Sequence, residues 1–256
     1  TPCQQRLIKG NEMFKKTKCL LLGAVLCLNS WYAHSATTAY SNNFNQGADS
    51  AWSSQLWTST SSGLITHNFL GAWDDFSTTL TLTGLETHQV VNFSFDLYVI
   101  GSVYGNFDPA IWSVSAGDSN NPAAFSFATT FSNIAGYSQA YPSSFPEGIN
   151  PAQTGSVAIN PFSSGMPNGV TAYHLDFTFQ HTTPDLSITF AGNGFLPYNG
   201  PTYGRWGLDN VEVAINAVPE PSNLPLFLLG LAILTGITSR NMGMPVGASP
   251  FRGNDG

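Results

Sequence analysis

The central part of the chain has almost no positive charge. Between residues 36 and 217 the only Lys or Arg is Arg205, against twelve Asp and Glu, so this stretch has a net charge of −11 with His neutral. Proteins that bind nucleic acid or anionic membrane surfaces use clusters of Lys and Arg to neutralise phosphate groups. The charge balance therefore argues against nucleic acid as a partner and leaves divalent cations and neutral glycans as candidate ligands.

Cysteine is also absent from this part, because Cys3, Cys19 and Cys27 all lie before residue 36. Residues 36–217 can form no disulfide, and they offer no thiolate nucleophile and no Cys-ligated metal site. The stretch is long enough to bury a substantial hydrophobic core. We therefore expect a domain that is held together by its core alone.

Long apolar runs are confined to the two ends of the chain. From Met13 the sequence reads MFKKTKCLLLGAVLCLNSWYAHS, in which a lysine-rich segment precedes an apolar stretch at 19–28 and a small-x-small tripeptide at 33–35. This is the layout of a secretory signal peptide that signal peptidase removes. We predict that residues 1–35 comprise some upstream residues and this signal, so that the chain is exported. A lipoprotein signal and an N-terminal core helix are the alternatives.

The second apolar run covers residues 224–239 and follows a Pro-Glu-Pro sequence. As a helix it would be about 24 Å long at about 1.5 Å per residue, somewhat shorter than a bilayer core of about 30 Å. The residues that flank it are Pro219, Glu220, Pro221 and Arg240. A transmembrane segment that is later removed, a permanent membrane anchor and a buried helix are all compatible with this run.

Residues 218–241 resemble the PEP-CTERM sorting signal of Gram-negative bacteria, in which Pro-Glu-Pro precedes a transmembrane helix and a short basic tail. The resemblance implies export, a transient stay in the inner membrane, and cleavage by an exosortase, a membrane-embedded cysteine protease. It also implies delivery to the cell surface or the extracellular polymer matrix. In this sequence Arg240 stands alone where a basic cluster is usual, and residues 242–256 continue beyond it as a predicted disordered tail.

The body of the chain consists of short β-type segments that are separated by Gly, Pro, Asn and Asp. The predicted strands are 78–85, 89–102, 111–117, 124–131, 155–159, 171–181, 185–192 and 206–215. In 89–102 the alternation places the odd-numbered residues from Val91 to Val99 on one face. No helical periodicity and no fixed-period repeat occur outside the two ends. The pattern predicts an all-β fold for residues 36–217, a single antiparallel β-sandwich flanked by a signal helix and a transmembrane helix.

Five segments of the body resemble secreted PEP-CTERM proteins with jelly-roll domains related to lectins and concanavalin A-like sandwiches. They are FLGAW (69–73), LTLTGLETHQVVNFSFDLYVIGS (80–102), DPAIWSVS (108–115), TTFSN (129–133) and WGLDNVEV (206–213). The resemblance implies a jelly-roll, concanavalin A-like sandwich. After the long strand such relatives often read Ser-Trp-Asp-Gly-Asn, whereas residues 102–106 here read Ser-Val-Tyr-Gly-Asn. The Asp that could contact a ligand in those relatives is therefore missing.

Catalytic motifs are scarce in this sequence. It contains no HExxH, no closely spaced pair of histidines and no GxSxG. Asp74 and Asp75 are adjacent, so in a strand their carboxylates would point to opposite faces and would not form a facing pair. We therefore expect a protein that is not an enzyme. A secreted glycan-active enzyme is the less favoured alternative, because glycosidase carboxylates need no local motif.

A calcium site is one use for the excess of acidic residues, because Ca²⁺ takes six to eight oxygen ligands. The candidate ligands are Asp209, Asn210, Asp49 and Asp108. Asp209 and Asn210 follow a Trp-Gly and open the last predicted strand, and Asp49 comes close to them if the terminal strands pair. Asp108 is a separate candidate in a loop. The alternative is that these acids cap turns and keep the domain soluble.

Aromatic residues in polar, Gly-rich stretches are candidate platforms for sugar rings. They are Trp52, Trp57, Trp73, Tyr104, Tyr198, Tyr203 and Trp206. The alternative is that these rings belong to the core, as most aromatics of a β-sandwich do. The sequence thus predicts an exported surface or matrix protein of a Gram-negative bacterium that binds exopolysaccharide in a biofilm, with a purely structural matrix role as the main alternative.

Overall fold

The computed structural model describes residues 36–62, 65–162, 169–196 and 204–217, which belong to one compact unit. These residues form strands and turns and no helix, so they include no helix that could cross a membrane. The predicted signal peptide, the predicted transmembrane run and the tail at 242–256 lie outside the described residues. So do the sorting-motif residues Pro219, Glu220, Pro221 and Arg240.

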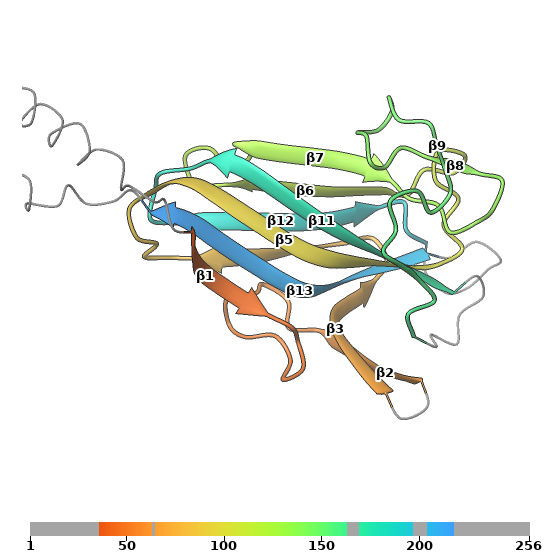
Figure 1. The fold of residues 1–256 in the computed structure, drawn as a ribbon, viewed down its shortest axis with the longest axis horizontal. Helices are drawn as coiled ribbons and strands as arrows, with labels where there is room; N and C mark the ends of the chain where they lie inside the picture. The colour runs from red at the N-terminus through yellow and green to blue at the C-terminus, as the bar shows by residue number, and fades with distance from the viewer. Residues whose placement is uncertain (1–35, 63–64, 163–168, 197–203, 218–256) are drawn as a thin grey trace, which may run out of the picture. The chain divides into compact units, whose positions relative to one another are not determined.

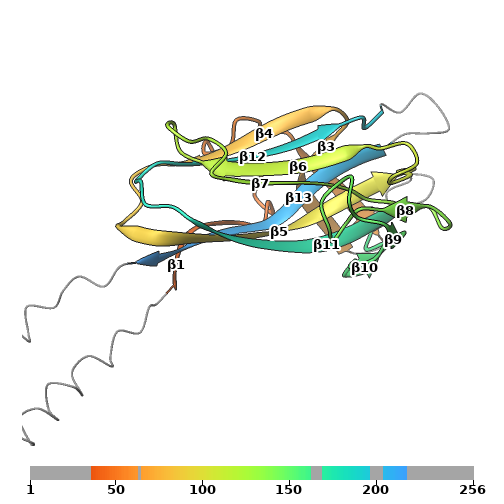
Figure 2. The ribbon, with the colours of Figure 1, turned by 90° about the horizontal axis from the view of Figure 1, so that it is seen from above.

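Two antiparallel sheets lie on top of each other as a β-sandwich (Figures 1 and 2). The larger sheet has the strand order β10-β11-β5-β13-β3-β2, and β1 also pairs with β13. Its strands are β1 (Ala36–Asn42), β2 (Trp57–Ser62), β3 (Ile65–Trp73), β5 (His88–Gly101), β10 (Ala158–Ile159), β11 (Val170–Gln180) and β13 (Gly204–Ala217). The smaller sheet has the order β4-β12-β6-β7. Its strands are β4 (Phe76–Leu82), β12 (Leu186–Asn193), β6 (Ile111–Gly117) and β7 (Phe125–Thr130), while β8 (Ser138–Gln139) pairs with β9 (Asn150–Pro151) outside both sheets.

The alternating segments of the sequence form the expected strands. The predicted strand 111–117 coincides with β6, and the other seven predicted segments overlap β4, β5, β7 and β10–β13. In β5 the odd-numbered residues from Val91 to Val99 are all buried, which confirms the predicted face. The all-β, antiparallel β-sandwich predicted for this part of the chain is confirmed.

Strands β1, β2 and β3 were not predicted from alternation. β1 reads ATTAYSN and β2 reads WTSTSS, so both consist mainly of small polar residues that give no apolar period. In β3 the alternation is interrupted at Gly71 and Ala72, which have φ values of 100° and 78°. These strands are specified by their pairing with β13 and with each other rather than by a local pattern.

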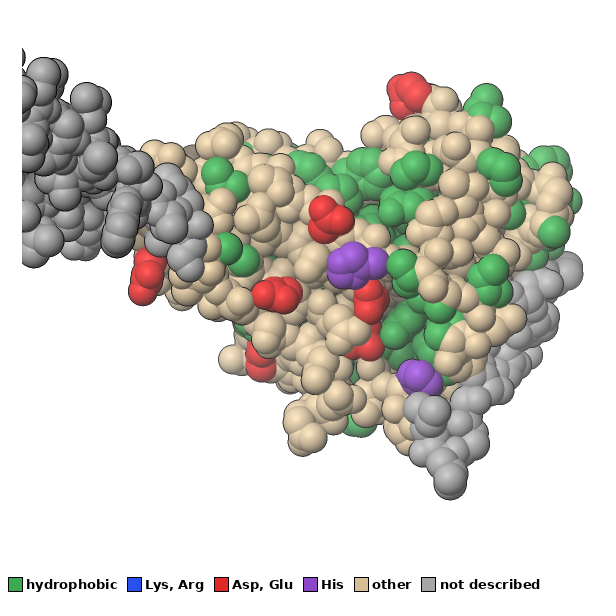
Figure 3. Space-filling view, in the orientation of Figure 1, with side chains coloured by type: hydrophobic (Ala, Val, Ile, Leu, Met, Phe, Trp, Pro, Cys, Tyr) green, Lys and Arg blue, Asp and Glu red, His purple; other side chains and the backbone are tan. Residues whose placement is uncertain are grey.

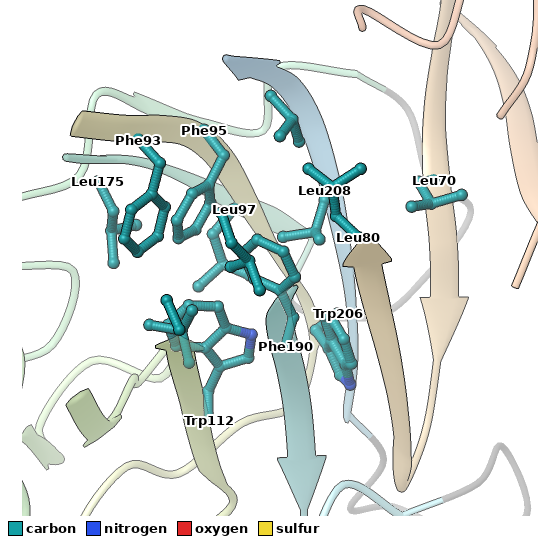
Figure 4. Close-up of a cluster of buried hydrophobic side chains, with 14 of the residues drawn as sticks. Leu70, Leu80, Phe93, Phe95, Leu97, Trp112, Leu175, Phe190, Trp206 and Leu208 are labelled. Atoms are coloured by element: carbon teal, nitrogen blue, oxygen red, sulfur yellow. The ribbon is translucent and has the colours of Figure 1, made fainter. Parts of the chain in front are cut away.

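The main core lies between the two sheets (Figure 4). Phe95 of the larger sheet meets Trp112 and Phe190 of the smaller sheet, with ring centroids 5.6 and 5.1 Å apart. All three side chains are fully buried. Burial of a large apolar side chain contributes roughly 1.5 to 3 kcal/mol, so these aromatics stabilise a domain without disulfides.

A second apolar cluster lies on the opposite face of the larger sheet. Tyr98 and Ile100 of β5 point away from the main core and are nevertheless 7% and 2% exposed. Phe162 covers this face, with its ring centroid 5.0 Å from that of Tyr98 and 5.4 Å from that of Phe69. One end of the outer sheet face is therefore closed by apolar packing, and the rest of that face remains polar.

Candidate functional site

Strand β13 changes its pairing partner halfway along its length. Residues Trp206–Leu208 pair with β3, whereas Val211–Asn216 pair with β1, and Figure 1 shows β1 and β3 meeting β13 at different points. Between these two segments Asn210 has a φ of 48°, and the register with β5 shifts. One extra residue in β13 forms a β-bulge, a feature common next to functional sites. Asp209 and Asn210 thus lie in the middle of the last strand, and the prediction that they open it is wrong.

The connection between β1 and β2 folds back beside this bulge. Its apolar anchors are Phe44 and Trp52, which are buried and lie 5.7 Å apart by ring centroid. The indole N–H of Trp52 donates to the Tyr40 hydroxyl at 2.7 Å, and that hydroxyl donates to the Asp49 carboxylate at 3.0 Å. Burial raises the pKa of Tyr40 to about 12, so the hydroxyl stays a donor. The loop is therefore held in one conformation by the core beneath it.

A groove of about 580 Å³ lies between this loop and the bulge. The polar residues that line it are Ser41, Asn42, Asn43, Gln46, Asp49, Asn210 and Glu212. Small-molecule sites in proteins commonly have volumes of about 300 to 1,000 Å³. The groove is therefore large enough for a small organic ligand, and its amides can both donate and accept hydrogen bonds.

An exposed tryptophan lies beside the groove. Gly47 lines the groove, and a Cβ atom on this glycine would lie 3.5 Å from ring atoms of Trp57, so the indole packs against it. Trp57 is 45% exposed although it is a large apolar residue. Of the aromatic residues predicted from the sequence to contact glycan, Trp57 is the one that the structure places next to a groove lined by amides and carboxylates.

The other predicted platforms are placed differently. Trp52, Trp73 and Trp206 are 3%, 4% and 0% exposed, so they are core residues and the prediction that their faces bind glycan is wrong. The physical reason lies in their glycine neighbours: a Cβ atom on Gly71 would lie 2.3 Å from Trp73, and one on Gly192 would lie 2.4 Å from Trp206. These glycines make room for buried indoles instead of marking exposed loops.

The three tyrosines of the predicted set are Tyr104, Tyr198 and Tyr203. Tyr104 is partly buried and packs edge-on against Tyr137 at 5.0 Å, in the connection between β5 and β6. Tyr198 and Tyr203 lie outside the described residues, and Tyr104 does not line the groove beside Trp57.

The predicted calcium ligands are only partly brought together. The terminal strands β1 and β13 do pair, and Asp49 and Asn210 consequently line the same groove. Asp108 lies elsewhere, beside a small pocket of about 20 Å³ near Tyr104. Among the residues that the structure describes, no three His, Asp or Glu side chains converge as a metal-ligand group. Calcium binding therefore stays a prediction.

Asp209 lies next to Asp96 and Tyr98 on the outer face of the larger sheet. Figure 3 shows several acids and a histidine close together on this face. Asp209 and Asp96 are directly opposite each other on β13 and β5. The Asp96 carboxylate accepts from the Asn210 amide at 2.7 Å and contacts His174 Nδ1 at 2.8 Å. The Tyr98 hydroxyl donates to Asp209 at 3.2 Å. Burial, and secondarily the charge of Asp96, raise the pKa of Asp209 to about 6 despite these hydrogen bonds.

Two histidines form a buried pair at one end of the sandwich. His88 Nε2 lies 2.8 Å from His181 Nδ1, and the two residues are 2% and 5% exposed. His181 Nε2 contacts the Thr183 hydroxyl, which donates to Asp118. Burial and the neighbouring His88 lower the pKa of His181. No local motif indicates this pair, because its members lie 93 positions apart.

No family model matches the chain, and no curated protein matches it. Several solved structures are similar to it at low levels, and three of them follow. The enzymatically active domain of tailspike protein 4 of bacteriophage CBA120 matches with 12% identity and a TM-score of 0.33, over 70% of this chain and 21% of that one. The exo-beta-1,3-galactanase of Phanerochaete chrysosporium, solved with galactose, matches with 15% identity and a TM-score of 0.27, over 70% and 29%.

The third similar structure is the CBM36-1 domain of a multidomain xylanase from the hindgut metagenome of Trinervitermes trinervoides. It matches with 10% identity and a TM-score of 0.23, over 73% of this chain and 94% of that one. The chain spans about a fifth of the length of the tailspike structure and less than a third of the length of the galactanase structure. Similarity at these levels assigns the chain to no family.

Proposed function

We propose that the chain is a glycan-binding protein of the cell surface or the extracellular matrix and that the groove beside Trp57 is its binding site. The observation that carries this proposal is the combination of an exposed indole with a groove lined by amides and carboxylates. A sugar ring presents an apolar face and several hydroxyl groups. The indole offers a large flat apolar surface for the apolar face of the sugar, and Asn and Gln offer hydrogen-bond donors and acceptors for its hydroxyl groups.

The loop between β1 and β2, which forms one wall of the groove, is held rigidly, and this supports a binding role. Phe44 and Trp52 fix the loop from below, and the Asn42 side chain accepts from the Phe44 N–H at 2.7 Å. The Asp49 carboxylate likewise accepts from the Ala51 N–H at 2.9 Å. A loop that is already ordered loses less conformational freedom when a ligand binds, so more of the contact energy is available as affinity.

The proposal includes the route to the cell surface and the finer fold class. The chain would be exported by its signal peptide, sorted by the segment at 218–241 and cleaved by an exosortase-type protease, with the sandwich being of the jelly-roll, concanavalin A-like kind. These parts rest on the sequence resemblance. The groove itself is formed by residues 41–49 and the bulge of β13, with Trp57 beside it.

The test is a glycan array that is probed with the purified full-length chain and with Trp57→Ala, together with a hydrolysis screen on the same sugars. Wild type should bind, and Trp57→Ala should lose at least tenfold in affinity. Phe107→Ala is the matched control, because Phe107 is 75% exposed and does not line the groove. Binding that survives Trp57→Ala would place the site elsewhere. Absence of any binding would favour a structural matrix role, and hydrolysis would favour an enzyme.

A further inference from the structure

The groove carries two negative charges that pair with no positively charged side chain of the described residues. Asp49 and Glu212 both line it. Within the described part of the chain the ion pairs are His174 with Asp96 and Arg205 with Asp74, so neither groove carboxylate takes part in one. Asp49 accepts from neutral donors, among them the Tyr40 hydroxyl, and Glu212 accepts from the Thr38 hydroxyl at 2.9 Å. The groove therefore attracts positive charge.

Glu212 also borders a second hollow of about 400 Å³ on the outer face of the larger sheet. This hollow is lined by Asn92, His174, Asp176 and Thr178, among others. The two hollows meet at Glu212, so acidic groups follow one another from Asp49 through Glu212 to Asp176. Figure 3 shows acids on this face and no Lys or Arg among its described residues. The arrangement suits an extended cationic polymer better than a single small molecule.

We propose that the groove selects glycans with protonated amino groups, such as partly deacetylated polyhexosamines, over neutral and acidic glycans. The inference rests on the proposed glycan-binding function and adds the class of sugar. A sugar ammonium supplies three hydrogen-bond donors and a positive charge to the carboxylates of Asp49 and Glu212. A uronic acid at the same place would meet like charge in a domain whose net charge is already −11 over residues 36–217.

The expected preference is about tenfold for an amino-sugar oligomer over its N-acetylated form, which is the size of one partly solvated charge pair at a protein surface. The preference should shrink as salt is added, because partly exposed charges are screened within about 10 Å at 0.1 M ionic strength. Binding through the indole and the amides alone would show little dependence on salt. Salt dependence therefore separates the charge contribution from the rest of the site.

The experiment measures the Kd of the full-length chain for glucosamine, N-acetylglucosamine and galacturonic acid hexamers at low and high salt. Glu212→Gln should lose most of the preference for the glucosamine hexamer over the N-acetylated hexamer. Glu147→Gln is the control, since Glu147 is an exposed acid that lines neither hollow. Unchanged melting temperatures would show that both variants are folded.

The possible results separate the two proposals. If wild type binds the glucosamine and N-acetylglucosamine hexamers equally and Glu212→Gln changes nothing, the amine preference is wrong and glycan binding stands, provided that Trp57→Ala abolishes both. Tighter binding of galacturonic acid would also overturn the preference. If no sugar in this set or on the array binds, the glycan-binding function itself fails.

Discussion

Replacing Asp209 with Asn should stabilise the domain at neutral pH. The Asp209 carboxylate is partly buried opposite Asp96, and its pKa is raised to about 6 from 3.8, first by burial and then by the charge of Asp96. Such a pKa corresponds to at most about 3 kcal/mol against the ionised form. Partial exposure reduces this, and we expect a gain of about 1 to 2 kcal/mol. Asn keeps an oxygen for the Asn210 N–H and places an amide beside the Tyr98 hydroxyl, which can then act as acceptor.

The pH dependence of the gain follows from proton linkage. The folded state binds the Asp209 proton more tightly than the unfolded state, so the free energy of unfolding of wild type falls as pH rises from about 4 to about 6. The difference between Asp209→Asn and wild type should therefore be largest above pH 6 and vanish below pH 4.

Urea unfolding at pH 4, 5.5 and 7.5 in EDTA measures the free energy of unfolding directly. Asp108→Asn is the control, because this exposed acid should change stability by less than about 0.5 kcal/mol. A variant that is less stable than wild type at pH 7.5, or a difference that does not vary with pH, would refute the reasoning.

Three further predictions concern the whole domain and its processing. Because burial and the neighbouring His88 lower the pKa of His181, the free energy of unfolding should fall as pH drops below about 6.5, and this fall should be smaller in His181→Gln; equal pH profiles in urea unfolding would contradict it. If calcium binds as predicted, millimolar CaCl₂ should raise the melting temperature of wild type and raise that of Asp209→Asn less; equal temperatures in EDTA and calcium would exclude the site. Intact-mass measurement of native surface protein should find a chain that starts near Ala36 and ends near Glu220, and a mature form that retains 224–239 would instead indicate a permanent anchor.

The sheet strands could be predicted where one face is buried and the other is polar. Segment 111–117 alternates between buried and partly exposed positions, and it coincides with β6. β2 could not be found in this way, because WTSTSS forms a strand at the edge of the larger sheet and has no apolar period. Edge strands with small polar residues depend on their neighbour for pairing, and a local pattern does not reveal that neighbour.

For the candidate site, the sequence predicts some of the residues but not their arrangement in space. We expect Asp49 to approach Asn210 if the terminal strands pair. In the structure β1 and β13 do pair, and both residues line the groove. The bulge that positions Asn210 depends on where β13 leaves β3 for β1, which is a property of three strands together. Likewise, the strand pattern of 185–192 does not show that Gly192 provides space for the ring of Trp206 in the core.

The position of β13 makes the larger sheet dependent on the end of the chain. β13 is the last strand in the described sequence, yet it lies between β5 on one side and β3 with β1 on the other. Without residues 204–217, the pair β5–β11 and the pair β2–β3 would share no hydrogen-bonded neighbour, and β1 would have no partner at all. The strands that are synthesised earlier can therefore complete the larger sheet only after β13 has been synthesised, because β13 connects them by long-range pairing. A chain that stops before Gly204 leaves the edges of β3 and β5 that face β13 unpaired, and such edges can pair with other chains. The larger sheet is therefore complete only once β13 has been made.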